Sequence, residues 1–307
     1  MAEPGNTARA LINWGATQFD KAGLVYAHGT DNAVDEAASL VMHTLGIGYQ
    51  QPDRVLDEII SNTDRQQVLA LLEKRISSRK PAAYLLQQAG FAGLTFYVDE
   101  RVLVPRSPIA ELIGAQFTPW IDPHRVSRVL DMCTGSGCIG IACAGAFPEA
   151  TVDLSDISTD ALAVASENIR RHGLETRVRT VASDVFASLA AERYDIIVVN
   201  PPYVPDAEQS QLADEFAHEP SVGLFAGHDG LAIVVNILRH AASHLCNDGI
   251  LIVEVGFTQD RLVQRFPDIP FMWLEFEFGG TGVFVLDSAQ LALYQPAFEQ
   301  AYLEYSG

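Results

Sequence analysis

The second half of the chain alternates short apolar runs with helical patterns, and this alternation limits the folds it can adopt. Apolar runs of strand length occur from Ser127 onward, over residues 128–131, 151–156, 177–182, 195–199 and 250–255. Helical patterns separate them, beginning near Gly137 and covering 159–172 and 231–245. Strands that alternate with helices are typical of a doubly wound sheet of mainly parallel strands. The sequence therefore predicts an α/β fold with a ligand site at the carboxyl ends of the strands.

The two ends of the chain differ from this pattern. Residues 271–278 and 282–286 flank Gly279-Gly280-Thr281 and predict a terminal antiparallel hairpin. Residues 7 to about 80 predict helices instead, with an apolar stripe over 11–26, helices over 34–45 and 53–60, and a fourth that Asp64 is expected to cap. No catalytic constellation occurs in this helical region. We expect it to hold a macromolecular substrate or cover the active site, and a purely structural role fits equally well.

Residues 90–108 change to strand-like patterning between these regions. The runs 91–98 and 101–104 flank Asp99-Glu100 and predict a β-hairpin, and Pro105-Arg106-Ser107-Pro108 ends it before a helix over 109–117. The chain of 307 residues is long enough for two domains. The sequence thus predicts an N-terminal helical domain over 1–89, a hairpin connector over 90–108 and a sheet domain over 109–307.

The overall charge limits the partners of the chain. Its formal net charge of −19 disfavours binding to nucleic-acid phosphates and suits a basic protein. The start of the chain has no signal-peptide pattern, and no apolar run reaches the ~18 residues of a membrane span, so we expect a cytoplasmic protein. The four cysteines form no C-x-x-C pair and the histidines no H-E-x-x-H pattern, so no metal site is expected.

A glycine-rich turn links the first strand to its helix: Asp131-Met132-Cys133-Thr134-Gly135-Ser136-Gly137. Glycines let the backbone approach a ligand, and the start of the helix offers free N–H donors. Residues 135–140 also match G-x-G-x-x-G, which is typical of nicotinamide dinucleotide sites. Asp156, at the end of the second strand, suits ribose hydroxyls with either cofactor. The glycine pattern alone leaves a dinucleotide and S-adenosylmethionine open.

Two features favour S-adenosylmethionine. Asp131 is unsuited to a neighbouring pyrophosphate, whereas its carboxylate suits the cationic amino-acid end of S-adenosylmethionine. Asn200-Pro201-Pro202-Tyr203, which follows the fourth strand, has no role in hydride transfer but suits the presentation of a nitrogen for methylation. Asp184-Val185-Phe186, after the third strand, are expected to bond the adenine amino group and pack on its ring. An N-cap role explains Asp184 equally well.

The turn Asn200-Pro201-Pro202-Tyr203 is stiff, because two prolines fix φ and remove two N–H donors. A planar amide can stack on Tyr203 while its N–H groups donate to the Asn200 side-chain oxygen and the Pro201 carbonyl. These bonds strengthen as positive charge develops on the nitrogen. An ordinary strand-ending turn is the alternative for these four residues alone.

With these residues in place, the sequence resembles the protein glutamine N5-methyltransferases that carry the Asn-Pro-Pro-Tyr motif. The resemblance covers nearly the whole chain. It implies a Rossmann-like class I S-adenosylmethionine-dependent methyltransferase sheet with a terminal antiparallel hairpin, preceded by a helical domain for substrate recognition. It also implies methyl transfer to the side-chain amide nitrogen of a glutamine, with S-adenosyl-L-homocysteine as the other product.

Four stretches resemble the branch of this family that modifies large-subunit ribosomal protein L3: residues 98–108, residues 131–138, His218-Glu219-Pro220 and Trp273-Leu274-Glu275-Phe276. Relatives that modify peptide-chain release factors typically have Pro-Arg-Pro-Glu-Thr-Glu at residues 105–110 and a glycine in place of Cys133. The implied partner is L3, free or in a ribosome assembly intermediate, with neither DNA nor a membrane as a partner.

The expected site residues follow from these motifs and from the resemblance. The expected catalytic residues are Asn200, Pro201 and Tyr203. The expected cofactor-binding residues are Asp131, Cys133, Thr134, Gly135, Ser136, Gly137, Asp156, Ile157, Asp184, Val185, Phe186 and Asn200. The expected substrate-binding residues are Asn200, Pro201, Pro202, Tyr203 and Glu219, although a surface turn explains His218-Glu219-Pro220 as well.

Four other functions stay open at this point. A release-factor glutamine methyltransferase shares the chemistry and differs in its partner. An adenine-N6 DNA methyltransferase holds an exocyclic amine with the same four residues, but the charge of −19 argues against it. The intact cofactor and Asn-Pro-Pro-Tyr turns argue against a non-catalytic ribosome-binding module. A dehydrogenase is the least favoured of the four.

Overall fold

The computed structural model describes residues 4–48, 50–189 and 192–306, which belong to two compact units. Unit 1 contains the residues up to Ala89 together with Val98–Glu100 and Ala213–His218. Unit 2 contains Gly90–Tyr97, Arg101–Leu212 and the residues from Glu219 onward. The chain therefore leaves unit 2 twice to contribute a short segment to unit 1.

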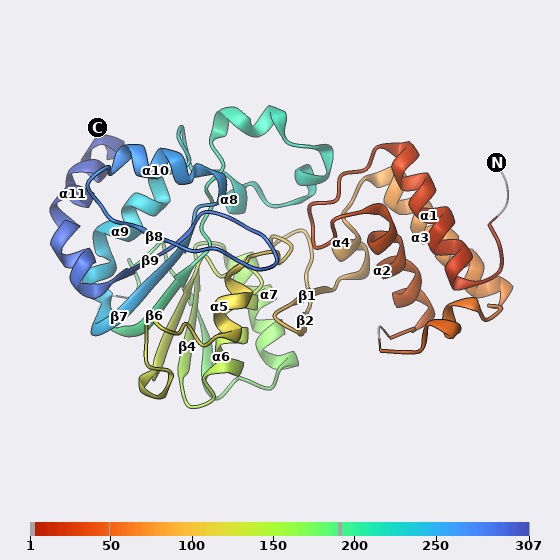
Figure 1. Ribbon diagram of the computed structural model, residues 1–307, viewed down its shortest axis with the longest axis horizontal. Helices are drawn as coiled ribbons and strands as arrows, with labels where there is room; N and C mark the ends of the chain where they lie inside the picture. Colours follow the sequence, from red (N-terminus) through yellow and green to blue (C-terminus); the bar gives the residue numbers. More distant parts are fainter. Residues whose placement is uncertain (1–3, 49, 190–191, 307) are drawn as a thin grey trace. The chain divides into compact units, whose positions relative to one another are not determined.

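Within the described residues, unit 2 is organised around one seven-stranded sheet with the strand order β5-β4-β3-β6-β7-β9-β8 (Figure 1). The five predicted strands are present and pair in parallel: β3 (Arg128–Met132), β4 (Thr151–Asp156), β5 (Val178–Ala182), β6 (Tyr194–Val199) and β7 (Leu245–Glu254). The predicted terminal antiparallel hairpin is also confirmed. It consists of β8 (Met272–Trp273), far shorter than expected, and β9 (Val283–Asp287).

Alternate strand residues face two separate cores, one on each side of the sheet. Val129 and Ile196 pack on one side, whereas their neighbours Leu130 and Ile197 pack on the other. The first side carries α5 (Ile109–Gly114), α6 (Cys138–Ala146) and α7 (Thr159–Arg171). The second carries α9 (Ala232–His244), α10 (Gln259–Arg265) and α11 (Ser288–Ser306). Helices on both faces make the sheet doubly wound, as the sequence predicts (Figure 1).

Two of these helices, α10 and α11, are not among the predicted elements. Helix α11 contains Pro296 in its interior, where proline removes a backbone donor and disfavours a helix. Tertiary packing on α9 holds it in place, since Arg239 Nε donates to Glu299 Oε2 at 2.5 Å and the guanidinium lies 4.1 Å from the centre of the Tyr302 ring. Phe298 of the same helix is fully buried in the core.

The small hairpin is present, but its turn was predicted at the wrong place. Its strands are β1 (Ala89–Phe91) and β2 (Leu94–Phe96). The turn is Ala92-Gly93, and both residues have the positive φ, 48° and 76°, that a two-residue I′ turn requires. Residues 97–107 contain no strand. The apolar run 101–104 resembles a second strand only because Val102 and Val104, each 1% exposed, pack into the interior as irregular backbone.

Unit 1 is helical, as predicted, with two local differences. Its elements are α1 (Ala8–Ala22), α2 (Ala33–Leu45), the 3₁₀ helix η1 (Asp53–Asp57), α3 (Asn62–Ser78) and α4 (Ala82–Leu86). The expected third α-helix is thus the short η1. The cap expected at Asp64 is wrong, because Ser61 caps α3: its hydroxyl accepts from the Asp64 N–H at 3.1 Å and donates to the Asp64 carboxylate at 2.8 Å.

Gly140, in the first turn of α6, has no room for a side chain. A Cβ atom there would lie 2.1 Å from Leu154 Cδ2 and 2.9 Å from Asp131 Cβ. We expect Gly140→Ala to lower the free energy of unfolding by about 1–3 kcal/mol in urea unfolding, because overpacking forces neighbouring groups to shift. The matched control is Gly145→Ala in the same helix, where a Cβ meets nothing within 4 Å and alanine should stabilise by about 0.5–1 kcal/mol. Equal stability of the two variants would contradict this packing.

Candidate active site

The predicted site residues directly follow the carboxyl ends of neighbouring parallel strands (Figure 1), so they lie at the same end of the sheet. Met132 pairs with Ser155 of β4 on one side and with Val199 of β6 on the other. The glycine-rich turn after β3 therefore lies between the end of β4, at Asp156, and the end of β6, at Asn200. Neighbouring strands thus bring together three motifs that are distant in the sequence.

The turn after β3 leaves its backbone open to a ligand. Cys133, Gly135 and Gly137 all adopt left-handed conformations, with φ of 57°, 54° and 82°. The Thr134 N–H donates to the Ser155 carbonyl at 3.0 Å, which ties the turn to the end of β4. A Cβ at Gly135 would meet nothing within 4 Å. The turn also includes Ser136, which is buried, and it ends where α6 begins and presents free N–H groups.

Asp131 links the turn to the first residues of α6 through hydrogen bonds. Its Oδ2 accepts from the Thr134 hydroxyl at 2.5 Å and from the Gly140 N–H at 2.8 Å. Its Oδ1 is buried and has no hydrogen-bond partner among the described residues. Burial raises the pKa of Asp131 to about 7, although the two hydrogen bonds favour the ionised form. One oxygen therefore has a structural role, and the other is available to a cationic ligand.

Asp156 also bonds to the turn. Its Oδ2 accepts from the Gly135 N–H and its Oδ1 from the Ser158 N–H, both at 2.9 Å. Burial raises the pKa of Asp156, although these two hydrogen bonds lower it. The next residue, Ile157, is 60% exposed, which is unusual for a large apolar side chain beside a buried turn. The predicted roles of Asp156 and Ile157 in cofactor binding stay predictions, and their positions beside Gly135 are compatible with them.

Residues 184–186 lie after β5 as predicted. Asp184 is exposed and its carbonyl accepts from the Ala187 N–H at 2.9 Å, in a turn in which Val185 has φ of 47°. Phe186 is 5% exposed, and its ring stacks on His244 of α9 at 4.2 Å between centroids. The Phe186 ring is therefore part of the core on this side of the sheet. Its expected contact with an adenine ring stays a prediction.

The motif after β6 is rigidly packed. Pro201 and Pro202 are buried, and Asn200 and Tyr203 are half-buried. The Tyr203 ring lies edge-on to Phe257 at 5.7 Å between centroids, and Phe257 is itself 60% exposed. A Cβ at Gly256 would come within 2.8 Å of the Tyr203 ring, so only glycine fits beside it. Tyr203 is thus fixed by the residues that follow the adjacent strand β7.

Glu254 is a site residue that the sequence analysis missed. It ends β7, is 6% exposed, accepts from the Ser107 hydroxyl at 2.5 Å and lies 3.5 Å from the Tyr203 hydroxyl. Burial raises its pKa to about 7, although the Ser107 hydroxyl, the Arg106 charge and the Tyr203 hydroxyl favour the ionised form. The sequence signal that could have revealed Glu254 is a single charged residue inside the apolar run 250–255.

Glu219 lies on the loop that follows the motif, and its carboxylate is already bound. It accepts from Arg106 in a two-pronged pair at 2.6 and 2.7 Å and from the Val104 N–H at 3.0 Å. Its side chain has no exposed surface. The observed contacts are structural, and the expected contact with substrate stays a prediction. His218, one residue earlier, instead bonds the Ser78 carbonyl at 2.9 Å.

The family described as Methyltransferase small domain matches residues 116–227, which include both turns of the site. The hMettl16 catalytic domain, solved in complex with MAT2A 3'UTR hairpin 6, has a similar fold: its TM-score is 0.50 at 14% identity, over 74% of this chain and 81% of that one. Within the described residues, no helix is long and apolar enough to span a bilayer. The fold is that of a class I methyltransferase.

Two curated relatives define the family more closely. The ribosomal protein uL3 glutamine methyltransferase of Xanthomonas campestris pv. campestris is 46% identical, over 94% of each chain. The protein of the same name from Xylella fastidiosa strain Temecula1 is 48% identical, over 94% of this chain and 93% of its own. The chain belongs to the family of ribosomal protein uL3 glutamine methyltransferases.

The residues at this end of the sheet fit S-adenosylmethionine, the methyl donor of the class. The unpartnered Asp131 Oδ1 suits its cationic amino-acid end, and the space over Gly135 leaves room for close approach. The turn itself contains a carboxylate and no basic side chain, which disfavours a pyrophosphate. The cofactor expected from the sequence is therefore compatible with the residues present.

The raised pKa of Glu254 predicts a pH-dependent stability. The folded protein binds this proton more tightly than the unfolded chain, so the stabilisation is complete below about pH 4.5 and is lost as the pH rises through about 7. Glu254→Gln removes this pH dependence of the stability. Asp131, whose pKa is also raised, contributes the same pH dependence to the variant and to the wild type. We expect urea unfolding to show the variant gaining up to about 3 kcal/mol on wild type between pH 5 and pH 8. A pH-independent difference would contradict a protonated Glu254.

Proposed function

We propose that this protein transfers a methyl group from S-adenosylmethionine to the side-chain amide nitrogen, N5, of a glutamine in ribosomal protein uL3. The observation that carries the proposal is the pairing of Met132 with Val199, which sets the cofactor turn next to Asn200-Pro201-Pro202-Tyr203. The membership of the family supports the glutamine and the uL3 partner.

The acceptor determines what the protein must contribute. An amide nitrogen attacks poorly, because its lone pair is delocalised into the carbonyl. The Asn200 side-chain oxygen and the Pro201 carbonyl each accept one N–H of the glutamine, and both bonds strengthen as positive charge develops on nitrogen. S-adenosylmethionine supplies an electrophilic methyl group on a positively charged sulfur. The nitrogen then releases a proton to water, so no dedicated base is required.

Tyr203 sets the plane of the amide in this proposal. Its ring is held against Gly256 and Phe257, so it presents a fixed face. Burial and then the Glu254 charge raise the pKa of Tyr203, which keeps its hydroxyl neutral. A rigid aromatic surface lowers the entropy that the substrate amide loses on binding and favours the developing positive charge.

The cofactor is held by the turn and by the ends of the two neighbouring strands. Asp131 binds the amino-acid end, and Asp156 the ribose hydroxyls, while Ile157 covers the ring system from its exposed position. The open backbone at Gly135 supports this placement. Asp184 is exposed and available to the adenine amino group.

The charge of the chain is compatible with uL3 as the partner. A protein with a net charge of −19 attracts a basic protein and repels free nucleic acid. We infer that uL3 is methylated free or in a ribosome assembly intermediate, in the cytoplasm, with no direct binding of DNA. The helices of unit 1 are the part of the chain that we assign to recognition of uL3.

Methyl transfer from labelled S-adenosylmethionine tests the function. Purified uL3, peptide-chain release factors and DNA are offered in parallel, and the product is located by mass spectrometry. We expect one methyl group on a glutamine side chain of uL3. Label on a release factor alone would keep the chemistry and overturn the partner, and label on DNA alone would overturn both.

Asn200→Ala tests the role of the amide oxygen. We expect kcat for uL3 methylation to fall by ~10²–10³, the usual effect of losing one fixed hydrogen-bonding group at a site of developing charge. Asn247→Ala, at an exposed position early in β7, is the matched control and should keep wild-type turnover. Near-wild-type kcat in Asn200→Ala would contradict the mechanism.

A further inference from the structure

A closed loop begins at the residue after Tyr203. We call residues 204–226 the post-motif loop. Its two ends are hydrogen-bonded to each other: the Val204 N–H donates to the Leu224 carbonyl at 2.9 Å, and the Ala226 N–H donates to the Val204 carbonyl at 3.0 Å. The loop contains the 3₁₀ helices η3 (Asp206–Gln211) and η4 (Asp214–His218) and the short helix α8 (Ser221–Leu224). Its two ends belong to unit 2, whereas Ala213–His218 belongs to unit 1.

Glu215, in η4, is buried within unit 1. Its side chain has no exposed surface. Its Oε1 accepts from the Val25 N–H at 3.1 Å, forms an ion pair with Arg79 at 2.9 Å, and lies 3.8 Å from the guanidinium of Arg75. Burial raises the pKa of Glu215, but the Val25 N–H and the two arginines outweigh it and lower the pKa overall. Glu215 is therefore a carboxylate at neutral pH.

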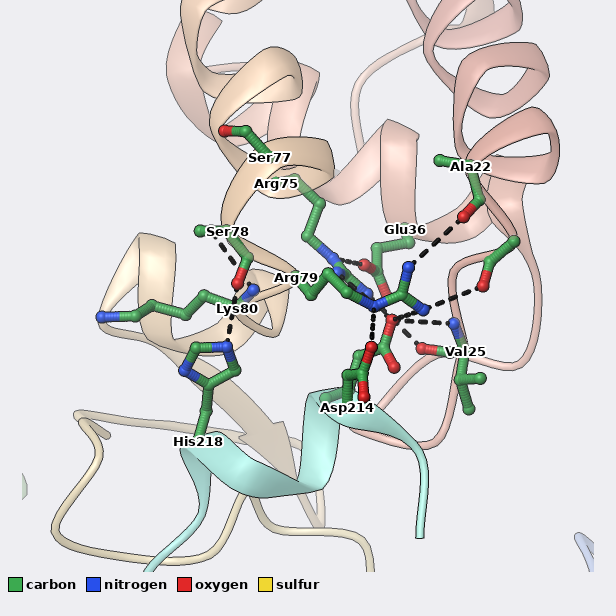
Figure 2. A network of polar contacts seen from close by, with 12 residues as sticks. Ala22, Val25, Glu36, Arg75, Ser77, Ser78, Arg79, Lys80, Asp214 and His218 are labelled. Carbon is green, nitrogen blue, oxygen red and sulfur yellow. Dashed lines mark hydrogen bonds and ion pairs between the residues drawn. The ribbon is translucent and has the colours of Figure 1, made fainter. Parts of the chain in front are cut away.

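Figure 2 shows the polar groups of this cluster in unit 1, which include Glu36, Arg75 and Arg79. Arg75, itself fully buried, also pairs with Glu36, and Arg79 also donates to the Gly23 carbonyl at 2.9 Å. At the edge of the same cluster, Asp214 pairs with Arg79 at 3.4 Å and His218 bonds the Ser78 carbonyl. The middle of the post-motif loop is thus held by Arg75 of α3, by Arg79 directly after that helix, and by the backbone of Val25 and Ser78.

A second buried carboxylate holds the loop four residues later. Glu219 pairs with Arg106 and the Val104 N–H within unit 2, as described above. A buried carboxylate stays ionised where a cation compensates its charge, and both Glu215 and Glu219 lie beside arginines. The segment 215–219 is therefore fixed at both ends: Glu215 bonds within unit 1, and Glu219 bonds within unit 2.

We propose that Glu215 is a positioning residue: by inserting into the helices of unit 1 it holds the post-motif loop in the conformation in which residues 200–203 bind the target glutamine. The inference rests on the proposed function. Tyr203 and Val204 are joined by one peptide bond, and Val204 closes the loop on Leu224 and Ala226. Displacement of the loop therefore moves the backbone that directly follows the Tyr203 ring.

The proposal assigns unit 1 a second role beyond contact with a partner. Misplacement of a reacting group by about 1 Å costs on the order of 10²-fold in rate. A loop that has lost its anchor in unit 1 retains the contacts of Glu219, so the fold of unit 2 and its cofactor turn are preserved. Loss of the anchor should therefore reduce methyl transfer and leave binding of S-adenosylmethionine unchanged.

The test compares Glu215→Ala and Glu215→Gln with Asp214→Asn. Asp214 is the neighbouring carboxylate and binds the same arginine, but its side chain is 81% exposed, so it is the matched control. We expect Glu215→Ala to speed amide hydrogen exchange over 204–226 by at least about 10-fold and to lower kcat/KM for uL3 by about 10- to 100-fold. Glu215→Gln keeps an acceptor for the Val25 N–H and should show a smaller loss. Asp214→Asn should stay within about two-fold of wild type.

Calorimetric binding of S-adenosylmethionine separates positioning from general damage. An affinity within two-fold of wild type in Glu215→Ala supports the proposal, and a parallel loss of affinity and activity overturns it. Faster exchange with unchanged kcat/KM also overturns it. If Glu215→Ala does not fold, Arg79→Ala removes the same 2.9 Å ion pair from the other side and is judged by the same two measurements.

Failure of the proposed function gives a different result. Wild-type protein that does not methylate uL3 would overturn the substrate while hydrogen exchange over 204–226 still responds to Glu215→Ala. Exchange that is the same in wild type and Glu215→Ala would overturn the anchor, whatever substrate the protein methylates.

Discussion

The parallel pairing of β3 with β6 is the contact on which the site depends. Because Met132 lies opposite Val199, the turn that begins at Asp131 and the motif that begins at Asn200 leave the sheet next to each other. Glycine and proline act in opposite ways at these two strand ends. Gly135 leaves the backbone open to a cofactor, whereas Pro201 and Pro202 make the acceptor turn stiff. The sheet sets the distance between the two turns, and the residues in them decide what each binds.

Two buried carboxyl groups, Asp131 and Glu254, bond to this pair of turns, and a third, Glu215, lies within unit 1. Asp131 and Glu254 are close to their ionisation point near neutral pH, because burial opposes their charge and only hydroxyl or N–H groups bond to them directly. Glu215 stays charged because Arg75 and Arg79 lie beside it. A buried carboxyl group in this chain thus either titrates near neutral pH or stays charged, and the nearby cations decide which.

Much of the fold was predictable because it depends on local patterns. The five parallel strands and the helices α7 and α9 follow from apolar runs and helical periodicity, and their limits differ by a few residues at most, except at the start of β7. The elements that were missed depend on distant partners. Helix α11 forms on α9 despite Pro296. The run 101–104 was mistaken for a strand because Val102 and Val104 are buried without pairing.

The sequence by itself determined the order of the motifs along the chain and the chemistry of the two turns, because a glycine-rich turn and Asn-Pro-Pro-Tyr carry their properties in adjacent residues. Only the tertiary structure decided the roles of Glu254, Glu219 and Glu215. The sequence marks Glu254 only as a charge in an apolar run and Glu219 only through a resemblance, and it does not single out Glu215. The function of each comes from burial beside Ser107, Arg106 or Arg79, which lie more than a hundred positions away in the chain. A carboxylate has a defined role only once its solvent is removed and its partners are fixed.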